Sequence, residues 1–138
     1  KCDQREFLAH SAIEATQKIN VAGIITDSET GLTARILASF RGSNPVLAIC
    51  YKEKTQRWLN LSYGVIPVHQ KEKGLVSAQY VFYAALRMLR QKGYISLDDK
   101  IAYLSGSFGE GGGTTFLEIN NVKDVFDKKY KFHLPNFE

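Results

Sequence analysis

Two polar segments of this sequence combine glycine with hydroxyl side chains, a combination suited to binding an anion. The first is Ser28-Glu29-Thr30-Gly31-Leu32-Thr33, which follows a predicted strand and opens a predicted helix. Unpaired amides at a helix start face anions, and Gly31 would let the backbone approach a phosphate. The candidate ligands are Ser28, Thr30, Gly31 and Thr33. Capping of the helix by Ser28 or Thr30 is the alternative, and for this segment alone it is the commoner explanation.

The second segment, residues 106–115, joins the last two predicted strands and is rich in glycine. Its candidate anion-binding residues are Gly109, Gly111, Gly112, Gly113 and Thr114. A flexible hairpin connection is the structural alternative, but the segment holds more glycine than a hairpin needs. Ligands of open α/β sheets bind outside the carboxyl ends of strands, and both segments follow predicted strand ends. We therefore expect an anion site at these two segments.

A nucleoside triphosphate does not fit this chemistry. Neither segment has the Lys-Ser or Lys-Thr pair that neutralises a triphosphate and holds its magnesium. Glu29 and Glu110 lie inside the segments and would repel phosphate. The sequence therefore excludes a nucleotide P-loop and weakens the case for a highly charged ligand.

Residues that could do catalysis or bind a metal are few and scattered. The histidines are far apart in the sequence, and we expect a surface or packing role for each of them: His10, His69 and His133. Cys2 and Cys50 add no spacing suited to a metal. Adjacent Asp98 and Asp99 in a predicted turn point in different directions and make no carboxylate pair. We therefore expect neither an active site nor a metal in these residues.

Aromatic and basic residues gather within residues 51–63, a pattern that could form a nucleic-acid platform. They are Tyr51, Lys52, Lys54, Arg57, Trp58 and Tyr63. A partly buried short helix with solvated lysines explains them better. The net charge of +4 is weak support for an anionic partner, because charges of both signs are interspersed along most of the chain. We therefore expect no nucleic-acid partner.

Hydrophobic spacing predicts alternating helices and strands. Helices are expected at Arg5–Ile19, from about Thr33 to Gly42, at Lys52–Leu61 and at Leu75–Lys92. Strands are expected at Val21–Thr26, Val46–Cys50, Val65–Val68, Lys100–Ser105 and Thr115–Ile119. Pro67 favours a sheet edge, and Asn20 and Gly93 are expected to end helices. Helical crossovers between buried strands imply a three-layer α/β/α fold with a mostly parallel sheet, whose last strand is free to run antiparallel.

The composition is that of one ordinary domain. The chain has 138 residues, 44% hydrophobic and 23% charged, which suffices for one core without disulfides or metals. No apolar run reaches the roughly 18 residues needed to cross a bilayer, so we expect no membrane partner. At most one disulfide and an expected buried Cys50 favour a reducing, cytoplasmic setting. The only methionine is Met88, and we therefore expect a piece of a longer chain.

Several segments, taken in order, resemble the C-terminal domain of pyruvate kinase from about His10 to Ile119. They are Ser11-Ala12-Ile13-Glu14-Ala15 with Lys18-Ile19-Asn20, Glu29-Thr30-Gly31-Leu32-Thr33-Ala34-Arg35, Pro45-Val46-Leu47-Ala48-Ile49, Thr55-Gln56-Arg57 with Leu59-Asn60-Leu61, Gly64-Val65-Ile66-Pro67-Val68 and Gly113-Thr114-Thr115. Each is weak alone, whereas their order and spacing make a specific match. The resemblance implies a mixed five-stranded sheet between helices, with the last strand antiparallel.

The resemblance also implies a function and its partners. Pyruvate kinase transfers phosphate from phosphoenolpyruvate to ADP in glycolysis, giving pyruvate and ATP, with magnesium and usually potassium. In that family the catalytic groups belong to a preceding barrel and its lid domain, so this chain alone is expected to be inactive and to hold no cofactor. The C-terminal domain would supply contacts in a homo-oligomer, a tetramer in the intact enzyme. In many members it also binds a phosphorylated metabolite as an allosteric effector.

The effector loops of the family resemble the two segments chosen above. The hydroxyl and glycine positions of the first loop correspond to Ser28, Thr30, Gly31 and Thr33, and the second loop corresponds to residues 109–115. Leu32 stands where the family often has a basic residue, and Val81 stands near a position where some bisphosphate-binding members carry arginine. A bisphosphate would therefore meet too little positive charge. A monophosphate, a nucleoside monophosphate, a bare anion and no effector at all stay open.

Residues 1–121 are expected to form the domain, and residues 122–138 a C-terminal tail. The tail alternates charge with apolar residues, and we expect Phe126, Phe132 and Phe137 to pack on the domain or on a neighbouring subunit. A second function stays open: a stand-alone domain that binds a small molecule or phosphate and was never joined to a catalytic barrel.

Overall fold

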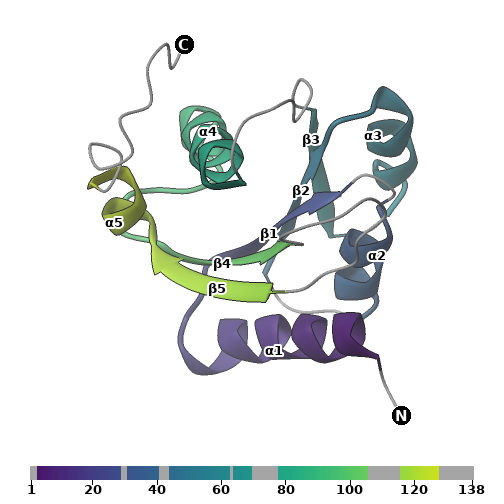
Figure 1. The fold of residues 1–138 in the computed structure, drawn as a ribbon, viewed down its shortest axis with the longest axis horizontal. Coiled ribbons are helices and arrows are strands. Elements are labelled where there is room, and N and C mark those ends of the chain that lie inside the picture. Colours follow the sequence, from purple (N-terminus) through teal and green to yellow (C-terminus); the bar gives the residue numbers. More distant parts are fainter. Residues whose placement is uncertain are drawn as a thin grey trace.

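The computed structural model describes residues 3–28, 31–40, 44–62, 64–69, 78–105 and 116–127, without the side chains of residues 28 and 78–81 (Figure 1). Its helices are α1 (Gln4–Lys18), α2 (Leu32–Ser39), α3 (Glu53–Leu59), α4 (Ala78–Gln91) and α5 (Val122–Asp127). Its strands are β1 (Gly23–Ser28), β2 (Val46–Cys50), β3 (Val65–His69), β4 (Lys100–Ser105) and β5 (Phe116–Asn121). Among these residues, no helix combines the length and the apolarity that a membrane crossing requires.

The strands form one mixed sheet in the order β3-β2-β1-β4-β5. The pairs β3–β2, β2–β1 and β1–β4 are parallel, because a helix returns the chain to the starting edge each time. β5 follows a direct connection instead and pairs antiparallel with β4. The expected mixed five-stranded sheet with an antiparallel last strand is confirmed.

Helices cover both faces of this sheet, which makes the three layers (Figure 1). Successive side chains of a strand point to opposite faces, so Ile24 and Ile25 enter two different cores. Ile24 packs with residues of α1, α2 and α3, and Ile25 packs with residues of α4 and α5. Figure 1 shows α1 below the sheet and α4 and α5 above it.

Three turn and edge signals of the sequence have the expected structural roles. Asn20 after α1 has a φ of 56° and Gly93 after α4 has a φ of 83°, both in the left-handed region that ends a helix. Pro67 lies in β3, which is an edge strand with β2 as its neighbour. Proline cannot donate to a sheet ladder, and an edge strand avoids that loss.

Two predicted boundaries are wrong. β1 runs over Gly23–Ser28 instead of Val21–Thr26, because Asp27 and Ser28 continue the parallel pairing with Ile49 and Cys50. α2 ends at Ser39 and not near Gly42, and the Phe40 N–H closes it on the Leu37 carbonyl at 3.3 Å.

A short helix, α5, follows β5 directly and was not predicted. Its first residue, Val122, is fully buried, and the Val122 N–H donates to the Asp99 carbonyl at 2.9 Å. Val125 and Phe126 pack against the core beneath α4. Phe132 and Phe137, the other aromatic residues expected to pack, lie outside the described residues.

Candidate functional site

The ends of β1 and β4 lie side by side where the connections of the sheet diverge. From β1 the chain passes through α2 to β2 on one side, whereas β4 lies on the other side of β1. Ligands of open α/β sheets bind outside the carboxyl ends of the strands at such a point. Thr26 of β1 pairs with Leu104 of β4, so the two strands finish together. The two candidate segments therefore start from the same corner of the sheet.

A carboxylate and two hydroxyl groups join the two strands at this corner. Ser105 Oγ donates to Asp27 Oδ1 at 2.6 Å, and the Tyr103 hydroxyl lies 3.4 Å from Asp27 Oδ2. One position earlier, Thr26 Oγ1 donates to the Leu104 carbonyl at 2.8 Å. Polar groups taken out of water need such partners, and Ser105 and Thr26 are almost fully buried. These bonds hold β1 and β4 in a fixed relation where the two segments begin.

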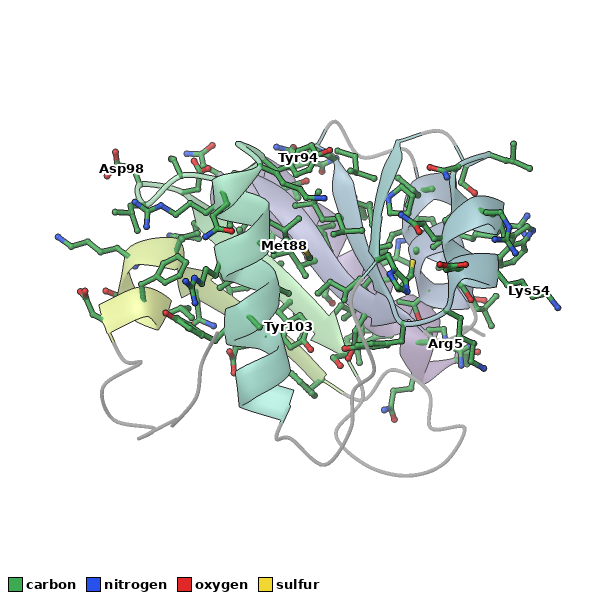
Figure 2. All side chains as sticks on the ribbon, turned by 90° about the horizontal axis from the view of Figure 1, so that it is seen from above. Arg5, Lys54, Met88, Tyr94, Asp98 and Tyr103 are labelled. Carbon is green, nitrogen blue, oxygen red and sulfur yellow. The ribbon has the colours of Figure 1, made fainter. Side chains whose placement is uncertain are left out.

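Tyr103 links this corner to the neighbouring elements. Its ring stacks on Phe82 of α4 at 4.2 Å between centroids and meets the edge of Phe116, the first residue of β5, at 5.8 Å. In Figure 2, which looks onto α4, Tyr103 lies next to that helix and far from Tyr94 and Asp98. Burial, together with the Asp27 carboxylate, raises the pKa of Tyr103 far above its usual value. The phenol therefore stays protonated and serves as a donor.

Gly31 starts α2 for reasons of backbone and packing. It occupies the N-cap with a φ of 84°, a left-handed conformation that glycine adopts readily. A Cβ built there would lie 2.9 Å from Trp58 Cζ3 and 3.2 Å from Leu59 Cδ2. The other contact of this tryptophan is Arg35, whose guanidinium carbon lies 4.6 Å from the ring centroid. Gly31 is thus needed for the contact between α2 and α3, whatever the segment binds.

The predicted site residues fall partly within the described structure. Ser28 is the last residue of β1 and pairs with Cys50, Gly31 caps α2, and Thr33 lies half-buried in the first turn of α2. The other candidates lie outside the described residues: Thr30, Gly109, Gly111, Gly112, Gly113 and Thr114. Capping of α2 by Thr30 lies outside them as well, and so does the Ser28 hydroxyl.

The residues around residues 51–63 match the expectation of a partly buried helix. Thr55 and Leu59 are buried, whereas Lys52, Lys54 and Arg57 are exposed. Trp58 is 41% exposed, but its ring packs on Gly31 and beneath Arg35, so its faces are engaged within the domain.

The remaining candidates for chemistry have structural surroundings. The His10 ring stacks on Phe40 at 3.8 Å. Asp99 accepts a hydrogen bond from the Ser96 N–H at 2.9 Å and so stabilises a turn. Cys50 is buried, and this burial raises the pKa of its thiol to about 11, which keeps it protonated and unreactive. Within the described ranges, no three His, Cys, Asp or Glu residues come together to hold a metal ion.

Sequence reasoning missed Asp27, Tyr103 and Ser105 as neighbours at the site. Asp27 was assigned to the turn after β1, and Ser105 to the end of an apolar strand. The available signal was a polar residue at the last positions of two otherwise apolar runs. Such residues at adjacent strand ends of an α/β sheet lie where ligands bind.

Comparison with known proteins places this domain among its relatives. Residues 6–120 match the family model described as pyruvate kinase, alpha/beta domain. A pyruvate kinase of Borreliella burgdorferi is 34% identical over 123 residues, which are 88% of this chain and 26% of that protein. A pyruvate kinase of Lactobacillus delbrueckii subsp. bulgaricus is 27% identical over 118 residues, which are 85% of this chain and 20% of that protein.

A solved structure shows the same fold. Cryptosporidium parvum pyruvate kinase in complex with ADP superimposes with a TM-score of 0.76 and 25% sequence identity. The match covers 88% of this chain and 24% of that one. The chain therefore spans about a quarter or less of the length of these relatives.

Proposed function

Because this chain belongs to the pyruvate kinase family through its alpha/beta domain, we propose that it is the C-terminal regulatory and subunit-assembly domain of a pyruvate kinase. The intact cytoplasmic enzyme would transfer phosphate from phosphoenolpyruvate to ADP in glycolysis. Its barrel and lid domains would hold the catalytic groups, magnesium and potassium. The short share of each relative that this chain covers supports this division, since most of a relative lies outside the match.

The regulatory role is a site for a phosphorylated metabolite at residues 28–33 and 109–115. The observation that carries it is the meeting of β1 and β4, because both segments leave the sheet at strand ends joined by the 2.6 Å bond between Asp27 and Ser105. Thr33 in the first turn of α2 offers a hydroxyl near the helix amides. A ligand held by both segments would bridge the end of β1 and the end of β4.

Coupling to catalysis would follow from assembly. An effector changes activity only if it binds one quaternary arrangement better than another. This domain would supply contacts between subunits of a homo-oligomer, a tetramer in the intact enzyme. On its own the chain would bind the effector and lack phosphotransfer activity.

Calorimetric titration of the chain with a hexose monophosphate, a hexose bisphosphate and adenosine monophosphate tests the effector site. We expect at least one of them to bind with a dissociation constant between about 1 μM and 1 mM. Thr33→Ala should weaken that binding about tenfold, the effect of losing a hydrogen bond to a charged group. Ser39→Ala is the matched control, since it removes an exposed hydroxyl at the far end of the same helix. Unchanged affinity in both Thr30→Ala and Thr33→Ala would refute the site.

A further inference from the structure

The Asp27 carboxylate stands at the root of both candidate segments. It directly precedes Ser28, where the first segment begins, and its partner Ser105 directly precedes residue 106, where the second begins. The proposed function places a ligand between these segments. Any such ligand would therefore lie near a carboxylate that the sequence pattern had assigned to a turn.

Hydrogen bonds and packing fix the position of this carboxylate. Ser105 and Tyr103 hold its two oxygens, and both of these residues lie almost completely out of solvent. Tyr103 in turn is wedged by its ring contacts with Phe82 and Phe116, on the side of the sheet that α4 covers (Figure 2). A charge held this way cannot swing away from a ligand as a surface aspartate could.

From this geometry we infer that Asp27 is a specificity-determining residue of the site, which selects against ligands with two phosphate groups. The inference rests on the proposed function. A carboxylate only accepts hydrogen bonds, so it repels a phosphate and attracts a hydroxyl or ammonium group. The preferred ligand would carry one anionic group and a body rich in hydroxyl or amine donors, such as a sugar monophosphate.

Replacing Asp27 with asparagine isolates the charge. The amide oxygen of Asp27→Asn can still accept from Ser105, and the side chain keeps its shape. We expect the affinity for a hexose bisphosphate, relative to that for the hexose monophosphate, to rise about tenfold, because a phosphate within several ångströms no longer faces a like charge. Calorimetry with both sugars on the same protein preparation gives this ratio.

Asp98→Asn is the matched control. It makes the same chemical change and the same change in net charge, and Asp98 is exposed at the end of the molecule opposite Tyr103 (Figure 2). Its affinity ratio should equal that of the unmodified chain. Equal melting temperatures of the two variants would show that both are folded.

The outcomes separate the two ideas. A ratio that rises in Asp27→Asn and not in Asp98→Asn supports the inference. Binding of both sugars with the same ratio in all three proteins overturns it and leaves the proposed site standing. If neither sugar binds any of the three, the proposed site fails, and the role of Asp27 fails with it.

Discussion

The indole ring of Trp58 lies against the Cα of Gly31, leaving no room for a side chain at the start of α2. A Cβ on Gly31 would come within 2.9 Å of the ring, and the residue already has a φ of 84°. Two separate penalties, backbone strain and overlap, therefore apply to any substitution at this position.

We predict that Gly31→Ala lowers the free energy of unfolding by about 2–4 kcal/mol, measured by urea denaturation without ligand. Gly93→Ala is the control, since Gly93 has a φ of 83° but open space around its Cβ position. That variant should cost about 1 kcal/mol from strain alone. Equal losses in the two variants would show that the contact with Trp58 imposes no packing constraint.

The same contact makes Trp58 a reporter of ligand binding. It is the only tryptophan of the chain and touches the residue at the centre of the first segment. We predict that a phosphorylated ligand changes its fluorescence with the dissociation constant found by calorimetry. Binding measured by calorimetry with no fluorescence change would place the ligand away from Gly31.

The bond from Ser105 to Asp27 should contribute more to stability than the bond from Tyr103. Ser105→Ala removes a buried donor 2.6 Å from a carboxylate and should cost about 1–3 kcal/mol. Tyr103→Phe keeps the ring contacts and loses a donor at 3.4 Å, so it should cost less than about 1 kcal/mol. Urea denaturation of both variants gives the order, and the reverse order would contradict the hydrogen-bonding geometry.

Alkaline pH should destabilise the domain partly through Cys50. Burial raises the pKa of this thiol from 9.0 to about 11, so the folded state holds the proton more tightly than the unfolded state. The resulting stability is complete below about pH 9 and is lost as the pH rises through about 11. Between pH 8 and pH 10.5, the native chain should lose about 2 kcal/mol more than Cys50→Ala in urea denaturation. Identical losses would mean that the thiol is not desolvated.

Helix α5 should stabilise the domain beyond the boundary expected at residue 121. Truncation after Asn121 removes the buried Val122 and the packing of Phe126, and should lower the melting temperature by several degrees. Truncation after Asp127 keeps α5 and is the control for loss of the tail alone. Equal melting temperatures for the two truncated chains would show that α5 contributes nothing to stability.

The sequence indicated most strands and helices because their apolar residues follow the period of each element. The run from Val46 to Cys50 has no competing interpretation as a surface strand, and Pro67 marked the edge strand correctly. The order of all five strands came from the family resemblance, since periodicity carries no information about which strands pair. Six-residue α5 escaped because it is too short for a helical repeat to stand out.

The site was predicted only in part for a related reason. Hydroxyl groups and glycine in residues 28–33 are visible as a local pattern. Asp27 and Ser105 are 78 residues apart and become neighbours only through the pairing of β1 with β4. A polar residue at a strand end resembles a turn residue until its partner on the next strand is known.

The central claim, that this chain is one domain of a pyruvate kinase, is tested most directly by the size of the native polypeptide. An antibody raised against the 138 residues would be used to immunoblot lysate of the source cells. We predict a band several times heavier than 15.5 kDa, since the chain spans 20–26% of the relatives compared above. A single band at 15.5 kDa would contradict the account and identify a free-standing binding domain without catalytic inheritance.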